Sequence, residues 1–457
     1  MKTRAAIAVS SLAFAVSALA TPPTVSDVTM SQDQQTCLVT VKYKLSGEPG
    51  VITLDIQTNY VENAETKWAS IGPENMLGFG GDVHQVVQPT TGDEVRTIYW
   101  NPETYWPGPP KAAGTARAVV TAWATNAPPD YMICHLISPY DITYYPYKEM
   151  VPGGITNIMY KGEYMAFRKI PAKGVTWMAG LPTNHIHYNE ASYPHRVMLT
   201  DDYYMAVYEL TTAQNNAING SAPGADHLPV ASTYTGARGT TSEGLNWPSY
   251  RQDGSFDYEL SHGVRSTSTL GKLRTMTGLA FDLPTEHQWE YACRAGSPGT
   301  IYTDTTPTLI LSTSDAETMA ALRRICRFSS NNKTADCEGL VNENGGSATV
   351  GSYEPNAWGL YDMLGNVHEV CLDWYDSWVN LYSDETKVYV DPVGPQRGEK
   401  TKVIYRGYHF KNTPTSNSTV IGSGKWAISM GGRLSMDRTY NGGISITEGA
   451  RFSLTLH

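Results

Sequence analysis

One stretch of the chain, residues 355–369, combines side chains that could do chemistry. Its carboxylate and amide side chains are Asn356, Asp362, Asn366 and Glu369, and its apolar positions follow neither the period of a strand nor that of a helix. Carboxylate and amide oxygens can cap turns or bind a hard cation such as Ca²⁺, and the two glycines in the stretch permit tight or left-handed turns. We therefore expect a backbone that specific side-chain and carbonyl contacts hold in place.

A helix over residues 285–296 is the clearest regular element that the sequence predicts. Thr285 and Gln288 form a capping box at its start, and Gly296 is a natural C-cap. Trp289 lies on the face that should be buried. This helix is therefore expected to pack into the core of its domain.

Two further sets of side chains each allow a chemical and a structural interpretation. Glu286 and Glu290 lie four residues apart on the predicted helix, which suits either acid–base catalysis or a capped, solvated face. His185, His187 and His195 could bind a metal ion together, or they could be solvated loop residues. The structural interpretation is favoured for both, since no Cys, Asp or Glu stands beside the histidines at the spacing of a zinc site.

The composition restricts the class of protein. A chain of 457 residues is longer than one ordinary core supports, so two domains are expected. With 41% hydrophobic and 17% charged residues the chain has the composition of a soluble globular protein. Its formal charge of −10 argues against nucleic acid or an anionic membrane surface as a partner. The 29 tyrosines against 8 phenylalanines suit either packed wide loops or recognition surfaces.

The first twenty residues have the pattern of a targeting segment. Lys2 and Arg4 precede a short apolar run at residues 5–16, and Ala-Leu-Ala at residues 18–20 is a small-residue cleavage site. The apolar run is too short to span a bilayer. The sequence therefore predicts an exported protein, periplasmic, cell-surface or secreted, with a mature chain from near Thr21 and no membrane span.

Export makes the six cysteines disulfide candidates, because disulfides persist in oxidising compartments. One disulfide is predicted between Cys326 and Cys337, which a short polar loop separates. Cys37 and Cys134, both in strand-like runs, predict a second. The remaining two cysteines are either free buried thiols or a third pair.

Residues 21–138 have the pattern of an all-β domain. Residues 37–45 alternate apolar and polar positions, and after a glycine turn residues 51–56 form a second run, which predicts a hairpin. Later strands are expected at residues 96–100, 116–123 and 131–137. Short strands punctuated by turns suggest a β-sandwich that resembles immunoglobulin or fibronectin type III modules, with a structural or interaction role.

A Tyr- and Pro-rich linker at residues 139–161 should join this domain to a second one at residues 162–457. The four tyrosines at positions 140, 144, 145 and 147 either form an aromatic binding strip or fill a packed connector. The packed connector is the favoured interpretation.

The second domain carries six runs in a characteristic order. Two are long: Leu-Pro-Thr-Glu-x-x-Trp-Glu-Tyr-Ala at residues 283–292, and Pro-Asn-x-x-Gly-Leu-Tyr-Asp-Met-x-Gly-Asn-Val-x-Glu at residues 355–369. The other four lie at residues 178–180, 209–211, 406–409 and 449–452. From about residue 167 onward the chain thus resembles the formylglycine-generating enzyme, or sulfatase-modifying factor, family. The resemblance implies an irregular α+β domain related in architecture to C-type lectins, so the expected fold class is α+β with a β-sandwich in front.

The resemblance also implies a chemistry, which this chain does not match. In the family, two cysteines shortly after an Arg-Gly-Gly-Ser motif hold copper(I), and a substrate cysteine is oxidised to formylglycine with molecular oxygen. Here the motif reads Arg-Gly-Tyr-His at residues 406–409, residues 410–418 contain no cysteine, and none follows Cys371. His368 also replaces the usual Trp. Because copper(I) needs soft thiolate ligands, neither copper nor formylglycine-generating activity is expected.

Calcium is the other metal that the resemblance implies. The ligands would be the main-chain carbonyls of Leu364, Gly365 and Val367 and the carboxylate of Glu369. A mixed carbonyl and carboxylate set suits Ca²⁺, and a tight glycine-containing turn lets successive carbonyls converge. The alternative is that Glu369 caps the same turn without a metal.

Two functions of different classes follow. In the first, the domain is a non-catalytic binding module for a glycan or a protein, with the loops between residues 406 and 449 as its surface. The candidate contact residues there are Arg406, His409, Trp426 and Tyr440. In the second, it is a metal- and oxygen-dependent oxidoreductase of the same family that uses a different residue set. The binding module is favoured, because the copper ligands are missing.

Overall fold

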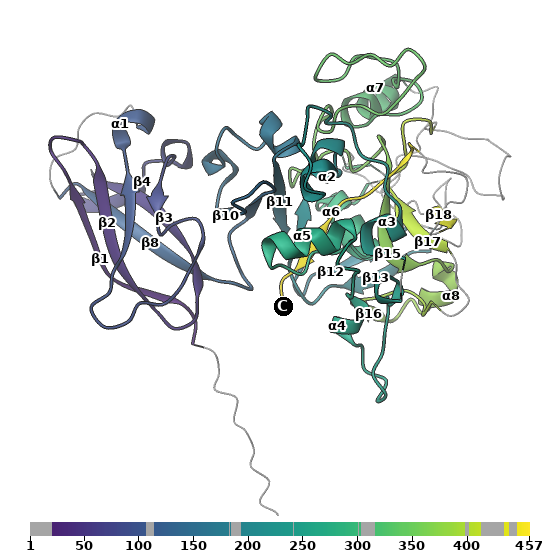
Figure 1. The fold of residues 1–457 in the computed structure, drawn as a ribbon, viewed down its shortest axis with the longest axis horizontal. Coiled ribbons are helices and arrows are strands. Elements are labelled where there is room, and N and C mark those ends of the chain that lie inside the picture. The colour runs from purple at the N-terminus through teal and green to yellow at the C-terminus, as the bar shows by residue number, and fades with distance from the viewer. Residues whose placement is uncertain are drawn as a thin grey trace, which may run out of the picture. The chain divides into compact units, whose positions relative to one another are not determined.

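The computed structural model describes residues 21–106, 114–181, 183, 193–240, 242–299, 301–302, 316–397, 402–412, 434–437 and 446–457. The chain divides into two compact units: Met1–Ala69 with Phe79–Thr125, and Ser70–Gly78 with Asn126–His457. Many short strands and few, short helices make the fold α+β (Figure 1). No helix in the described ranges is long and apolar enough to cross a membrane.

Unit 1 contains two antiparallel sheets. One has the order β1 (Thr24–Gln32), β2 (Val39–Ser46), β7 (Arg96–Trp100), β5 (Gly80–Gly81). The other has the order β4 (Glu65–Ser70), β3 (Gly50–Glu62), β6 (Val86–Val87), with β8 (Ala116–Ala124) also paired to β3. A short helix, α1 (Pro102–Tyr105), follows β7. The all-β character of this region is thus confirmed, while its immunoglobulin or fibronectin class stays a prediction.

Strand β2 shows the alternation that its sequence predicts, with Val41, Tyr43 and Leu45 buried and the residues between them more exposed. The predicted hairpin between β2 and β3 is wrong. Strand β2 pairs with β1 and β7, whereas β3 pairs with β6 and β8. The glycine turn therefore carries the chain from one sheet to the other, a choice that local turn chemistry does not determine.

The largest sheet of unit 2 has the order β10 (Ile142–Tyr145), β9 (Tyr131–His135), β11 (Tyr164–Ile170), β14 (Tyr203–Ala206), β20 (Ser453–Thr455). From the sequence, the residues of β9 are predicted to belong to the N-terminal domain and those of β10 to the linker. Their hydrogen-bonded partners place both in unit 2, because β9 pairs with β10 on one side and β11 on the other. The linker tyrosines Tyr144 and Tyr145 are accordingly buried in the sheet.

Two smaller sheets and seven helices complete the described part of unit 2. One sheet has the order β12 (Thr176–Ala179), β13 (His195–Met198), β16 (Val388–Val390). The other has the order β18 (Leu434–Asp437), β17 (Lys402–Arg406), β15 (His368–Trp374), β19 (Glu448–Gly449). The helices are α2 (Thr212–Ile218), α3 (Tyr234–Arg238), α4 (Tyr258–Ser261), α5 (Thr269–Thr277), α6 (Glu286–Arg294), α7 (Ala316–Ile325) and α8 (Trp378–Tyr382).

Helix α6 is the predicted helix, and its start is confirmed in detail. Thr285 is the N-cap, and its side chain and that of Gln288 exchange hydrogen bonds with each other's backbone N–H groups, which is the predicted capping box. The C-cap is Ala295, with a φ of 46°, rather than the predicted Gly296. Trp289 is fully buried, so the helix anchors the core of unit 2 as expected.

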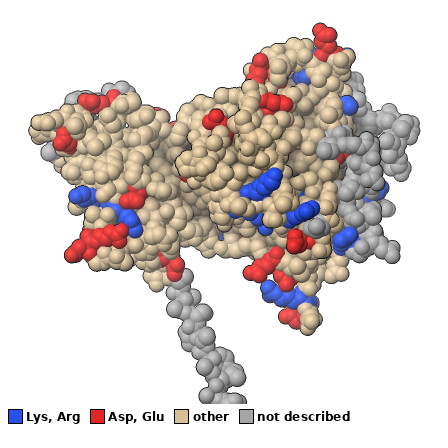
Figure 2. Space-filling view, in the orientation of Figure 1, with Lys and Arg blue, Asp and Glu red and all other residues tan. Residues whose placement is uncertain are grey.

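Acidic and basic side chains are interspersed over the face that Figure 2 shows, on both units. Uncharged residues cover most of that face. This mixed surface agrees with the low charged fraction of the sequence, 17%.

Candidate functional site

The carboxylate of Glu369, at the end of the stretch of residues 355–369, lies in a buried ion pair. Arg451 donates from Nη2 to Oε1 (2.6 Å) and from Nε to Oε2 (2.9 Å). Trp289 of α6 donates from Nε1 to the same Oε2 (2.6 Å). All three side chains are fully buried, so Glu369 binds the closing segment of the chain to the core helix.

A second buried ion pair lies beside the first. Arg406 at the end of β17 donates from Nη2 to Glu290 Oε2 (2.5 Å), and Arg294 donates to Glu290 Oε1 (2.7 Å). Burial alone would raise the pKa of Glu290, but the two guanidinium groups hold it below its ordinary value.

The prediction of a solvated face for Glu286 and Glu290 is wrong, since both are fully buried. Arg406 is fully buried as well, so the prediction that it contacts a ligand is also wrong.

The carboxylate of Glu209 accepts hydrogen bonds from the turn at residues 364–367. Asn366 donates from Nδ2 to Glu209 Oε2 (2.6 Å), and the Val367 N–H donates to Glu209 Oε1 (3.1 Å). Gly365, with a φ of 82°, donates its N–H to the carbonyl of Gly407 (2.6 Å). The turn thus has the specifically held backbone that the sequence predicts, and Glu209, rather than Glu369, is the residue that caps it.

These contacts decide whether the turn can bind calcium. The predicted ligands are Leu364, Gly365, Val367 and Glu369. The carboxylate does not fit the role, because Arg451 and Trp289 make four hydrogen bonds to its two oxygens and so fill its lone-pair sites. The main-chain part of the calcium site stays a prediction.

The predicted cleft residue His409 lies against His368, with ring centroids 4.4 Å apart and edge to face. Burial lowers the pKa of His409 to about 4, and it lowers the pKa of His368 well below its ordinary value, with His409 as a second cause. Both imidazoles are therefore neutral at pH 7. The other two predicted contact residues, Trp426 and Tyr440, lie outside the described residues.

The histidines considered as a metal site do not form one in the described part of the chain. His185 and His187 lie outside the described residues. His195 is buried, with its Nε2 2.9 Å from Nε2 of His287 and its ring stacked on Tyr382. Within the described ranges, no group of three His, Cys, Asp or Glu side chains is arranged to hold a metal ion.

All six cysteines lie in the described part of the chain, and all are free thiols, so both predicted disulfides are wrong. The Sγ of Cys326, just after α7, donates to the carbonyl of Leu322 (3.2 Å). Cys337 is exposed, and its Sγ lies 3.3 Å from Ser352 Oγ. Cys37 belongs to unit 1, whereas Cys134 is buried in β9 of unit 2. Sequence proximity and a shared strand pattern therefore do not predict pairing here.

We expect a thiol titration to distinguish these cysteines. In native protein, Ellman's reagent should react first with the exposed Cys337 and then with the half-buried Cys37, because the other four thiols are buried. Cys337→Ser should remove the fast phase alone. In denaturant without reductant, all six thiols should react; a smaller number would show a disulfide and overturn the assignment.

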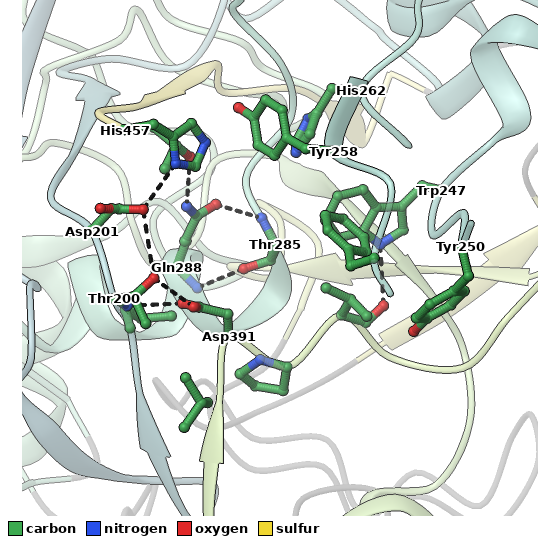
Figure 3. Close-up of a pocket in the computed structure, with 16 residues that line it drawn as sticks. Thr200, Asp201, Trp247, Tyr250, Tyr258, His262, Thr285, Gln288, Asp391 and His457 are labelled. Carbon is green, nitrogen blue, oxygen red and sulfur yellow. Dashed lines mark hydrogen bonds and ion pairs between the residues drawn. The ribbon is translucent and has the colours of Figure 1, made fainter. Parts of the chain in front are cut away.

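A cavity of about 480 Å³ lies within unit 2, where the end of β16 and the starts of α4 and α6 meet. We call it the Trp247 cavity. Figure 3 shows Thr200, Asp201 and Asp391 on one side of it and Trp247 and Tyr250 on the opposite side. Sequence analysis missed this site. Four aromatic residues close together in the sequence, at positions 247, 250, 256 and 258, could have indicated it. The cavity that they line also needs elements far apart in the chain, which the sequence does not bring together.

The family described as "Sulfatase-modifying factor enzyme 1-like domain" matches residues 134–427, well over half of the chain. The chain belongs to this family. The predicted resemblance is thereby confirmed. The sulfatase-modifying factor domain begins at β9, in agreement with the sheet that β9 joins.

Similar proteins cover parts of this sulfatase-modifying factor domain. A "Serine/threonine-protein kinase pkn1" of Chlamydia pneumoniae is 34% identical over 121 residues, 25% of this chain and 14% of that protein. A "Formylglycine-generating enzyme" of Streptomyces coelicolor is 34% identical over 159 residues, 31% of this chain and 44% of that protein. This chain thus spans less than half of either relative. Among solved structures, PvdO from Pseudomonas aeruginosa has 19% identity and a TM-score of 0.39, over 64% of this chain and 94% of that one.

The sulfatase-modifying factor domain of this chain does not fit copper(I). The sequence after residue 409 contains no cysteine, so the thiolates expected there are absent. Of the cysteines nearest the buried ion pairs, Cys293 donates towards the carbonyl of Met363 (3.8 Å) and Cys371 towards that of Glu369 (3.9 Å). Burial raises the pKa of both thiols, so they stay protonated.

Proposed function

We propose that this sulfatase-modifying factor domain is a non-catalytic module that binds a glycan or a protein ligand. The observation that carries the proposal is the missing thiolate pair. No cysteine follows Cys371, and Cys293 and Cys371 are buried and protonated. Hydroxyl, amide and ammonium groups are poor ligands for copper(I), so residues 410–418 offer no replacement.

The buried ion pairs support a binding role in a second way. Glu290 and Glu369 are carboxylates that could act in acid–base catalysis if they reached a substrate. Both are fully buried and paired with arginines instead. They stabilise a scaffold on which surface loops and cavities can vary.

The alternative function, an oxidoreductase with a different residue set, has one observation in its favour. His368 and His409 replace the family's Trp and Ser at the start of its cleft, and their neutral rings lie 4.4 Å apart. Neutral imidazole is a good ligand for several transition metals. Two histidines are too few for a catalytic site on their own, so the binding role is the stronger proposal.

The experiment that separates the two functions is metal analysis combined with oxygen uptake. We expect the purified protein to contain no stoichiometric copper or iron, and to leave oxygen uptake at background with a cysteine-containing peptide, before and after loading with copper(I). The matched control is His368→Phe with His409→Phe, which should behave identically. Retained copper or iron, with uptake that depends on the peptide thiol and is lost in the double variant, would overturn the binding role.

We also propose that the protein is exported, on the basic, apolar and small-residue pattern of residues 1–20. Expression of the full chain in a bacterial host with separation of periplasm and cytoplasm tests this. A periplasmic product that begins near Thr21 is expected, and an uncleaved cytoplasmic product would contradict export.

A further inference from the structure

Side-chain N–H groups and carboxylates both line the Trp247 cavity. Two of the donors that line it are already engaged within the protein. Trp247 donates from Nε1 to the carbonyl of Val393 (3.2 Å), and Gln288 donates from Nε2 to Thr455 Oγ1 (3.1 Å). A ligand therefore does not accept from these two N–H groups, and the donors left to it include the hydroxyls of Tyr250 and Tyr258.

The acceptors are two carboxylates on one wall (Figure 3). Asp391 accepts from the Thr200 N–H at Oδ1 (2.9 Å) and from the Thr200 hydroxyl at Oδ2 (2.6 Å). Asp201 Oδ2 lies 2.9 Å from His457 Nδ1. Each carboxylate has about four lone-pair sites, so both keep capacity for a ligand that donates.

Among the described residues that line the cavity, two are carboxylates, Asp201 and Asp391, and the imidazole of His457 lies within ion-pair distance of Asp201. Of the described residues that line it, none is Lys or Arg. His262 lies with Nδ1 2.8 Å from Asp282, and burial lowers the pKa of His262, so this wall adds a neutral ring at pH 7. Asp201 and Asp391 therefore favour a cation.

The opposite wall is aromatic. Trp247 and Phe256 pack edge to face with ring centroids 5.6 Å apart, and Tyr250 packs edge to face on Phe256 at 6.0 Å. Tyr258 lies 4.3 Å from the ring of His457, near the acidic wall. Such rings bury a methylene stem and attract a cation to their faces.

We propose that the Trp247 cavity binds a primary alkylammonium group, of the kind that ends a lysine side chain. An ammonium group donates three hydrogen bonds and accepts none, which matches the acceptor-rich wall. A neutral sugar gains no attraction from the negative charge of the two carboxylates, and an anion is repelled by it. The inference rests on the proposed binding role and names the chemical class of a ligand for it.

The test is a calorimetric titration of the full chain at low salt with Nα-acetyl-lysine N-methylamide. Its neutral counterpart, Nα-acetyl-norleucine N-methylamide, has the same stem without the ammonium. We expect the lysine derivative to bind at least about tenfold more tightly than the norleucine derivative, because ion pairing and cation–π attraction both depend on the charge. Methyl α-glucoside serves as a third probe.

Asp391→Asn and Asp201→Asn should each weaken binding of the lysine derivative several-fold and leave that of norleucine unchanged. Asn is suited to position 391, because Asp391 has a φ of 41° and Asn tolerates the left-handed region. The matched control is Asp384→Asn, which removes a negative charge from a turn that does not line the cavity. Unchanged melting temperatures would show that each variant is folded.

Equal affinity for the lysine and norleucine derivatives, or binding of neither, would overturn the inference. Binding of the glucoside alone would overturn it too, while leaving the proposed binding role intact. Conversely, an oxygen-consuming metalloprotein that still binds the lysine derivative would overturn the proposed function and support the cavity assignment. The two proposals therefore fail separately.

Discussion

Replacing Arg451 by Met is expected to lower the free energy of unfolding by about 3–5 kcal/mol, because it leaves the carboxylate of Glu369 buried without a countercharge. The guanidinium also donates to the carbonyls of Ala206, Val207 and Tyr361, so three buried acceptors lose a partner in the same variant. Chemical denaturation followed by far-UV circular dichroism measures the loss.

The matched control for Arg451→Met is Arg324→Met. Arg324 and Glu354 form an equally short pair (2.6 Å), but both side chains are more than half exposed. Its loss should leave the free energy of unfolding nearly unchanged, because solvent screens an exposed ion pair. Adding Glu369→Gln to Arg451→Met should cost less than the sum of the two single changes, since the second removes the uncompensated charge. Similar losses for Arg451→Met and Arg324→Met would contradict the role of the buried pair.

Gly365→Ala is expected to be the most damaging glycine substitution in the stretch of residues 355–369. A Cβ atom at position 365 would lie 2.2 Å from the carbonyl oxygen of Arg327, which is backbone and cannot rotate away. The variant combines the strain of a left-handed alanine, about 1 kcal/mol, with a displacement of packed backbone that costs about 1–3 kcal/mol or more. The readout is the midpoint of denaturant unfolding, or the yield of folded protein.

Gly359→Ala is a close control for this prediction. Gly359 and Gly365 have the same φ of 82° and lie in the same stretch, but a Cβ at position 359 meets nothing within 4 Å. The difference between the two alanine variants therefore isolates the steric clash from the conformational strain. Equal stability of the two would show that the turn is not packed against the backbone of Arg327.

Features that depend on a few neighbouring residues are predictable from the sequence. The capping box of Thr285 and Gln288 is complete in the sequence itself, and the alternation of β2 needs only one buried face. The family could be recognised because its motifs are contiguous runs, such as residues 355–369. These features give the fold class and the location of the domain.

Features that depend on distant partners are not predictable in the same way. Glu369 has the residue type and position of a metal ligand, and only the contact with Arg451, 82 residues further along, shows that it is an ion-pair partner. From its motif Arg406 is predicted to contact a ligand, yet it forms an ion pair in the core with Glu290, 116 residues earlier. Long-range electrostatics thus decide which charged residues reach solvent.

The order of strands in the central sheet has a consequence for folding kinetics. Strand β14 lies between β11, which precedes it in the chain, and β20. Arg451, two residues before β20, donates to the carbonyl of Ala206 across 245 positions of chain. During synthesis β14 therefore emerges long before β20 can cover its second edge. Such high contact order slows folding and leaves an unpaired strand edge open to other chains. We expect this domain to depend on chaperones, or on slow translation, more than its mature stability suggests.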